Sequence, residues 1–397
     1  MLPLWYRRNE KPVTMVKHHG FFRHRQDFFE TTAMMVAGTI GAGVLSLPYA
    51  ISHAGLPFGL LLIVILGGLM IGLNLLLGEV IERTRGKMQL AGLAHKYLGR
   101  TGGVLMTMVF YLMLLGAITV YIIGEGETLT ALFGGSPIFW SLGFAGLVFL
   151  LVYIGIDAIR KVEFFFSIGV IGIIVLIGLF GTKFMVPTHF TYYNWANILL
   201  PYGVILFAFH GTSSVVEAHT LVGRRGKIFR KSIIWAGAIV MLAYLFFTAA
   251  VVGVTGLGTT EIATIGLGHV VGPMIFYLGN IFAALAMFTC CLMASTSLRD
   301  SLSWDYRISR GPATLLVCGI PLLIFLFGVR AFTAAIDLVG GVFVSLELIL
   351  IILIYFRAKK FGDVSPGQYH LNYALPFAIL LLLIFSIGTV YGVVKIF

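Results

Sequence analysis

Residues 35–48 read Met35-Val-Ala-Gly-Thr-Ile-Gly-Ala-Gly-Val-Leu-Ser-Leu-Pro48, an apolar run that glycines interrupt at positions 38, 41 and 43, and we expect Pro48 to close this break. A second apolar segment is interrupted at Phe207-Ala-Phe-His-Gly-Thr-Ser-Ser214, and Gly211 follows Gly41 by 170 residues. Unwound backbone is tolerated at membrane depth only where it faces a cavity, a ligand or other protein. Glycines also occur where helices simply pack closely. Breaks at matching places in two halves of a chain, however, point to the central binding site of a transporter.

The composition predicts an all-α integral membrane protein. Hydrophobic residues make up 59% of the chain, charged residues 11%, and the mean hydropathy is +1.00. A spanning helix needs roughly 20 mostly apolar residues. We count eleven such stretches, centred near residues 42, 70, 114, 147, 171, 207, 242, 285, 319, 344 and 384. Residues 1–27 form a basic tail without the apolar core of a cleavable signal peptide.

The basic residues predict the orientation in the membrane. If the N-terminus is cytoplasmic, 24 of the 27 Lys and Arg residues face the cytoplasm, and only Lys183, Arg330 and Lys395 face outside. Short loops rich in Lys and Arg are retained inside, so this asymmetry supports an odd number of spans and an extracellular C-terminus. The net charge of +11 then reflects topology and affinity for anionic lipid, and it requires no nucleic-acid partner.

The chain divides into two blocks of five spans and one additional span. We expect a cytoplasmic tail over 1–27, a first repeat over 28–185, a second repeat over 194–358, and a last helix over 373–396. Five is an odd number, so the second block enters the membrane from the opposite side. The result is a five-plus-five inverted repeat whose first and sixth helices are broken.

Enzyme chemistry is not indicated. The sequence has no nucleotide-binding P-loop, nucleophile elbow or zinc-protease motif. Its three cysteines, Cys290, Cys291 and Cys318, all lie in apolar segments and are interpreted as packing residues. We therefore expect no cofactor, no firm metal site and no obligate protein partner.

The run Val36–Pro48 resembles the first-helix signature of the amino acid/auxin permease family, within the amino acid-polyamine-organocation superfamily. Bacterial aromatic and hydroxy amino acid permeases are the most similar members. The resemblance continues at Phe207-Ala-Phe-His-Gly211, at Gly223-Arg-Arg-Gly-Lys227 and at 292–302. It implies a broken-helix, five-plus-five fold, commonly eleven spans, and secondary active amino acid uptake coupled to H⁺ or, in some branches, Na⁺.

A zwitterionic amino acid at the bilayer midplane needs partners for both charges. The amides around Gly41, Ala42 and Gly43 open a helix N-terminus that favours a carboxylate. Carbonyls near Thr39, Phe207 and Phe209 can accept from the ammonium group. Tyr121, Phe209 and small residues of the eighth span are candidates for the side-chain pocket, although ordinary core packing is the more common role of any single aromatic residue. The predicted substrate-binding set is Thr39, Ile40, Gly41, Ala42, Gly43, Tyr121, Phe207, Phe209, His210, Gly211 and Thr212.

Buried ionisable residues are candidates for ion coupling. Histidine is the side chain whose charge commonly changes at physiological pH, and His210 lies in the second break, where it either carries a proton or ties down loose carbonyls as a neutral imidazole. Glu217 either relays protons or locks the inner half-helix by pairing with a base such as Arg299. Glu347, in the tenth span, has no evident partner in the sequence.

Other acidic residues lie near the ends of spans, where roles other than ion coupling are expected. Glu79, Asp157 and Glu163 lie near cytoplasmic ends, where pairing or snorkelling is expected, and Glu125 and Glu127 lie at the outer end of the third span. The resemblance also implies an alternative coupling-ion site, which would bind Na⁺. In sodium-coupled relatives a hydroxyl residue of the eighth span meets carbonyls of the broken first helix, and Gly38, Ile40 and Thr289 are the matching set here.

The sequence thus predicts a secondary active transporter of neutral or aromatic amino acids that works by alternating access, with H⁺ favoured over Na⁺. The alternative is a non-transporting amino acid sensor that has kept a transporter fold. A channel is a weaker third possibility.

Overall fold

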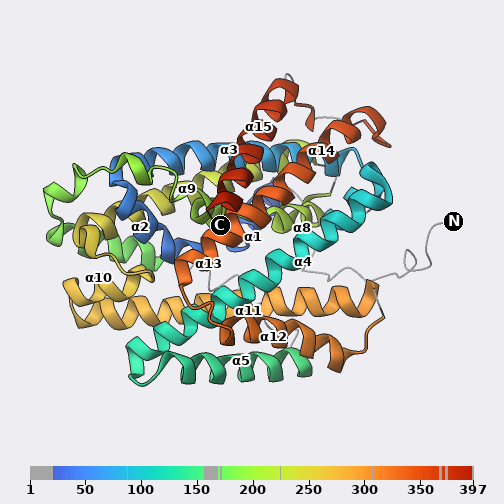
Figure 1. Ribbon diagram of the computed structural model, residues 1–397. Coiled ribbons are helices and arrows are strands. Elements are labelled where there is room, and N and C mark those ends of the chain that lie inside the picture. The colour runs from blue at the N-terminus through green and yellow to red at the C-terminus, as the bar shows by residue number, and fades with distance from the viewer. Residues whose placement is uncertain are drawn as a thin grey trace.

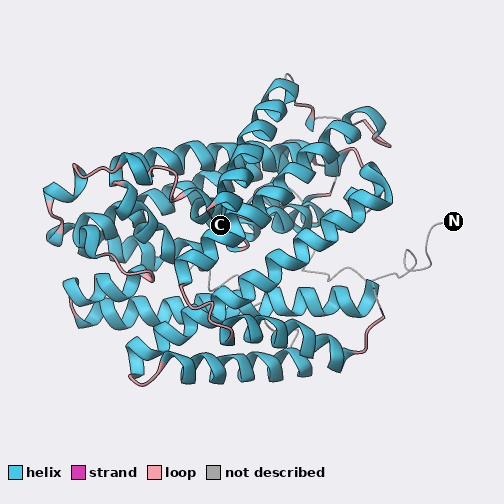
Figure 2. Ribbon diagram, in the orientation of Figure 1, coloured by secondary structure: helices cyan, strands magenta, loops and turns pink. Residues whose placement is uncertain are grey.

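The computed structural model describes residues 21–395 except positions 87, 156–168, 170–171, 224, 306, 366–368 and 372–373. The described residues form helices and loops and contain no strand (Figure 2). Within these ranges, seven helical stretches are long and apolar enough to cross a membrane. They are α3 (Leu56–Glu82), α4 (Leu90–Phe133), α5 (Pro137–Ile154), α9 (Gly226–Thr255), α11 (Pro273–Asp305), the continuous stretch α13 (Phe332–Leu338), η6 (Val339–Val344) and α14 (Ser345–Phe361), and α15 (Ala374–Val394).

The seven stretches contain seven of the eleven expected span centres, at residues 70, 114, 147, 242, 285, 344 and 384. The centre at 319 lies in α12 (Arg310–Leu326), which is apolar but only 17 residues long. The centre at 171 lies outside the described residues, next to a short apolar helix over 172–184. The remaining two centres, 42 and 207, coincide with the broken segments.

Both predicted breaks are present. The first separates α1 (Phe21–Ala37) from α2 (Gly43–Ala54), and the second separates α7 (Tyr202–Phe209) from α8 (Thr212–Val222). Pro48 was expected to close the first break, but it lies inside α2. The glycines around residue 41, rather than the proline, therefore coincide with the interruption of the helix.

The helices form two groups, and the broken helices belong to one of them (Figure 1). In one group α4 packs against α5, α11 and α12, whereas in the other α3 and α1 pack against α9. The broken helices contact each other, α2 with α7 and α1 with α8, and α7 also contacts the π-helical turn η6. The two unwound segments are consequently held in the interior of the bundle.

Short elements complete the connections. The amphipathic stretch 90–98 is a separate helical segment, because Gly99 has a φ of +77° and kinks α4 there. The helix α10 packs against α11 and α9. The bounds are α10 (Ala263–Val271), η2 (Thr182–Phe184), η3 (Pro187–Phe190), η4 (Trp195–Asn197) and η5 (Gly256–Gly258).

Ion pairs gather the loops at one end of the bundle. Arg225, before α9, pairs with Asp27 of α1, and His219 of α8 lies 3.3 Å from a carboxylate oxygen of Glu82 at the end of α3. Lys96 pairs with Asp363, beyond the end of α14. This pairing, together with the amide of Arg85, holds the pKa of the Asp363 carboxyl below its usual value. Segments predicted to be cytoplasmic thus share one end of the molecule.

Candidate functional site

Glycines bring the two breaks into direct contact. A Cβ at Gly43 would lie 2.5 Å from Cα of Ala208, and a Cβ at Gly38 would lie 2.6 Å from Cβ of Ser214. A Cβ at Gly211 would overlap the hydroxyl of Thr39. None of Gly38, Gly41, Gly43 and Gly211 has a positive φ. Backbone angles are therefore not the reason for these glycines. Close approach between the helices is the reason at Gly38, Gly43 and Gly211.

Tyr244 of α9 ties the two unwound segments together, and the sequence analysis missed it. Its hydroxyl lies 2.8 Å from the carbonyl of Ala208 and 3.2 Å from the carbonyl of Thr39, and it donates to both. The side chain is fully buried, and its ring packs edge-on against Phe209 with the centroids 5.0 Å apart. A tyrosine in the middle of an apolar helix needs a hydrogen-bond partner for its hydroxyl. This sequence feature could have identified Tyr244.

Tyr244→Phe is expected to destabilise the protein by about 2 kcal/mol. The substitution keeps the ring but leaves the carbonyls of Ala208 and Thr39 without their shared donor, and an unsatisfied buried acceptor costs about 1–3 kcal/mol. Thermal unfolding of the purified protein in detergent measures the change. Tyr277→Phe, at a tyrosine that is 53% exposed on α11, is the matched control. Equal stability of both variants would contradict a tethering role.

Backbone amides at the breaks are available to a ligand. Within the described residues, the amides of Gly41, Ala42 and Gly211 have no acceptor, as expected for groups that precede the first turn of a helix. The carbonyls are less available than predicted. That of Thr39 accepts from Tyr244, and that of Phe207 accepts from the amide of His210 at 3.2 Å. Each carbonyl oxygen still has a second lone pair.

Tyr121 is brought to the first break, together with a cysteine that was interpreted as packing. A Cβ at Gly41 would lie 3.3 Å from Sγ of Cys290 on α11 and 4.0 Å from the hydroxyl of Tyr121 on α4. These are the only neighbours within 4 Å that a Cβ at this glycine would meet among the described residues. Gly41 therefore faces the junction between the broken helix and the α4–α11 group.

Phe209 lies on the other side of the breaks. It is 3% exposed, and a Cβ at Gly67 of α3 would lie 2.8 Å from its ring. With Thr39, Asn74 and Ser214 it also lines a cavity of about 20 Å³, which has room for about one water molecule. This packing is the alternative that was weighed for Phe209. Ile40 and Ala42 are buried, whereas Phe207 is half-buried.

His210 forms a buried polar cluster with a residue far away in the sequence. Its Nε2 lies 3.1 and 3.2 Å from the two carboxylate oxygens of Glu347. Thr212 donates to Oε1 of Glu347 at 2.6 Å, and its hydroxyl lies 3.2 Å from Nε2 of His210. Glu347 is fully buried. The glutamate without an evident partner in the sequence thus has two, and both belong to the second break.

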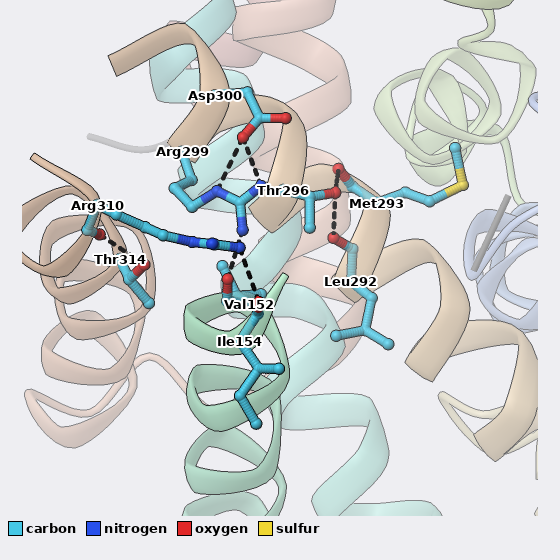
Figure 3. A network of polar contacts seen from close by, with 9 residues as sticks. All are labelled: Val152, Ile154, Leu292, Met293, Thr296, Arg299, Asp300, Arg310 and Thr314. Atoms are coloured by element: carbon cyan, nitrogen blue, oxygen red, sulfur yellow. Dashed lines mark hydrogen bonds and ion pairs between the residues drawn. The ribbon is translucent and has the colours of Figure 1, made fainter. Parts of the chain in front are cut away.

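Arg299 has a different role from the one considered. It pairs with the adjacent Asp300 and donates to the carbonyl of Val152 near the end of α5, while Arg310 donates to the carbonyl of Ile154 at 2.9 Å (Figure 3). The two arginines therefore satisfy the last carbonyls of α5, where cations are favoured. Glu217 is exposed on α8 rather than buried.

The other candidates for ion coupling are spread over the bundle. Thr289 donates to the carbonyls of Leu285 and Ala286 in its own helix, at 3.1 and 3.0 Å. Glu79 pairs with Arg83 at 2.7 Å, as expected near a helix end. Glu125 is 2% exposed. Asp157 and Glu163 lie outside the described residues.

Comparison with known proteins agrees with this architecture. The sequence profile of the tryptophan/tyrosine permease family matches residues 25–395. The chain belongs to the tryptophan/tyrosine permease family. The permease is 26% identical over 364 residues to tyrosine-specific transport system 1 of Haemophilus influenzae, covering 83% of this chain and 88% of that protein. It is 25% identical over 381 residues to glutamine transporter 2 of Aliivibrio fischeri, covering 89% and 97%.

Solved transporters share the fold at low identity. A manganese transporter of Eremococcus coleocola superposes with a TM-score of 0.68 at 15% identity, covering 96% of the permease and 89% of that chain. MhsT in complex with L-phenylalanine superposes with a TM-score of 0.65 at 13% identity, covering 94% and 98%. The permease is accordingly a multi-pass membrane protein of an amino acid transporter family, and its homologues are transporters, not enzymes.

Proposed function

We propose that the permease is a secondary active symporter for a neutral or aromatic amino acid, driven by H⁺ and working by alternating access. One observation carries the proposal: the amides of Gly41, Ala42 and Gly211 have no acceptor in the described chain and lie at the contact between two broken helices. Such amides suit the carboxylate of an amino acid. The tyrosine and glutamine specificities in the names of its relatives support this substrate class.

The binding mode follows from the surroundings of the breaks. The substrate carboxylate binds at the amides of Gly41 and Ala42, and the ammonium group uses the remaining lone pairs of the Thr39 and Phe207 carbonyls. The substrate side chain then points toward Tyr121 and Cys290, the groups nearest to Gly41. No fixed side-chain charge is required, because each half-helix end supplies a partial charge.

Alternating access requires two units that move relative to each other. We propose eleven spans, with repeats over 28–185 and 194–358 and a last helix over 373–396. The arrangement supports this, because the broken helices pack with α3 and α9, while Gly41 in the first break faces Tyr121 and Cys290 of the α4–α5–α11–α12 group. Rocking of one group against the other exposes the breaks to each side in turn.

Counterflow in liposomes tests the function. Purified permease is reconstituted with unlabelled L-tyrosine inside, and uptake of tracer L-tyrosine is followed with no ion gradient. Transient, saturable accumulation of tracer is expected, and L-tryptophan, L-phenylalanine and L-glutamine serve as competitors. A sensor would give no counterflow, and a channel would give uptake without saturation.

We expect the N-terminus to be cytoplasmic and the C-terminus to be extracellular. A membrane-impermeant thiol reagent is therefore expected to label Lys183→Cys, but not Arg100→Cys, in intact cells. Both positions are exposed, and breaking the cells makes Arg100→Cys reactive as the control. The clustering of Arg225, Lys96 and the end of α14 at one end of the bundle supports this orientation. The reverse labelling pattern would overturn it.

A further inference from the structure

The His210–Glu347–Thr212 cluster joins the second break to α14, a helix that the sequence analysis left without a role. His210 lies between α7 and α8, and Thr212 is the first residue of α8. Glu347 is in the first turn of α14, directly after the π-helical turn η6. Gly340 in that turn approaches the backbone of Gly203 in α7 so closely that a Cβ would overlap it. The Glu347 side chain therefore directly contacts residues of the second break.

We propose that the symported proton is carried by Glu347, with His210 as its hydrogen-bonding partner. This inference rests on the proposed symport function and identifies the group that couples H⁺ to it. The sequence had pointed to His210 alone, or with Glu217. The structure replaces Glu217 with a carboxylate that contacts His210 through both of its oxygens.

Burial makes the pair sensitive to the number of protons that it holds. Glu347 is fully buried and His210 is 14% exposed, so a net charge in this place is costly. With no added proton the pair carries one negative charge, which the hydrogen bond from Thr212 only partly offsets. With one added proton, on the carboxylate or on the imidazole, the pair is neutral overall. The enclosed state therefore retains one proton, and release requires access to water.

The proton balance of the transport step is simple. On the outer side a hydronium ion transfers a proton to the Glu347 carboxylate, which forms an O–H bond and leaves water. On the inner side the proton passes from Glu347 to a water molecule and restores the carboxylate. Because Thr212 donates to Oε1 of Glu347 and Nε2 of His210 lies near both oxygens, protonation changes the hydrogen bonds at the start of α8.

Neighbouring charges do not neutralise the pair in another way. The ionisable groups on the helices packed around it have their own partners: Glu79 with Arg83, Glu82 with His219, Asp337 with Lys395 and Tyr202 with Ser345. From α4, Tyr121 lies at Gly41 and Glu125 lies one turn further along the helix. Tyr244 donates to carbonyls of the breaks. Among these described contacts, His210 is the only ionisable side chain that contacts Glu347.

Glu347→Gln separates exchange from coupling. Glutamine has nearly the same size, its carbonyl can accept from Thr212, and it is permanently neutral like the protonated acid. In liposomes with L-tyrosine as the probe, the variant is expected to retain counterflow within about twofold. It should lose accumulation driven by a pH gradient. In the wild type, one proton moving down a driving force of 100 mV can support roughly fiftyfold accumulation of substrate. Asp363→Asn, at an acid in a loop outside the membrane-spanning helices, should keep both activities.

Thr212→Val provides a second test that does not depend on the stability of Glu347→Gln. It removes the hydrogen bond that the Thr212 hydroxyl donates to Glu347, a bond that favours the carboxylate over the acid. The midpoint of pH-driven tyrosine uptake is then expected to move to higher pH by about one unit. An unchanged midpoint would overturn the inference.

The outcomes distinguish the inference from the function on which it rests. If the wild-type permease shows no counterflow with any amino acid in the panel, the transport function fails. If the wild type exchanges tyrosine and Glu347→Gln still concentrates it along a pH gradient, the transport function stands and Glu347 is not the proton carrier. If accumulation by the wild type requires Na⁺ and does not depend on the pH gradient, Glu347 is likewise not the proton carrier.

Discussion

Replacing Gly41 with leucine is expected to abolish tyrosine binding while leaving the permease folded and inserted. A Cβ at Gly41 meets its neighbours, Cys290 and Tyr121, at ordinary or slightly tight distances. The remaining carbons of leucine would extend toward Cys290 and Tyr121, into the space where we place the contacts with the substrate. Loss of those contacts should weaken binding by at least about 100-fold, or about 2.7 kcal/mol. Equilibrium binding of tritiated L-tyrosine to purified permease measures this loss.

Two other glycines provide controls for that experiment. Gly68 of α3 has open space where a Cβ would lie, so Gly68→Leu should bind tyrosine normally. Gly43 differs because a Cβ there would lie 2.5 Å from the backbone of Ala208. Gly43→Ala should therefore lower stability by about 1–3 kcal/mol through overpacking. Normal tyrosine affinity in Gly41→Leu would place the substrate site elsewhere.

The backbone of the site was predictable because it depends on local sequence. Glycines that interrupt an apolar run act on their own helix, so the breaks near residues 41 and 210 could be located without knowing any neighbour. Pro48 was misplaced because a proline signals a disturbed helix without giving its position, and α2 accommodates it six residues from its start.

The side-chain partners were not predictable because they depend on which helices become neighbours. His210 and Glu347 are 137 residues apart, and neither segment carries a pattern that specifies the other. Tyr244 similarly contacts carbonyls near residues 39 and 208 that only the tertiary fold brings together. Arg299 was considered as a partner for Glu217 on charge alone, whereas the adjacent Asp300 and the end of α5 offered it closer partners.

The second large effect is expected in His210→Gln, which should keep tyrosine exchange but lose accumulation driven by a pH gradient. Glutamine can still donate a hydrogen bond to Glu347, so the break should stay folded. Glu347, however, loses the imidazole that lies 3.1 Å away and that shares the proton of the pair in our proposal, and glutamine cannot replace it in that role. A loss from roughly fiftyfold accumulation to none is expected at 100 mV. Tracer L-tyrosine uptake into liposomes with a pH gradient, or with a Na⁺ gradient alone, measures it.

Thr289→Ala is the matched variant that tests Na⁺ as the alternative coupling ion. The Thr289 hydroxyl already donates to carbonyls of its own helix, at 3.1 and 3.0 Å, so alanine should disturb the fold little. If H⁺ is the coupling ion, Thr289→Ala should still concentrate tyrosine along a pH gradient. If accumulation instead needs Na⁺, disappears in Thr289→Ala and persists in His210→Gln, the proton assignment is wrong. The Na⁺ site at Gly38, Ile40 and Thr289 would then take its place, and the His210–Glu347 pair would serve only to hold α8 against α14.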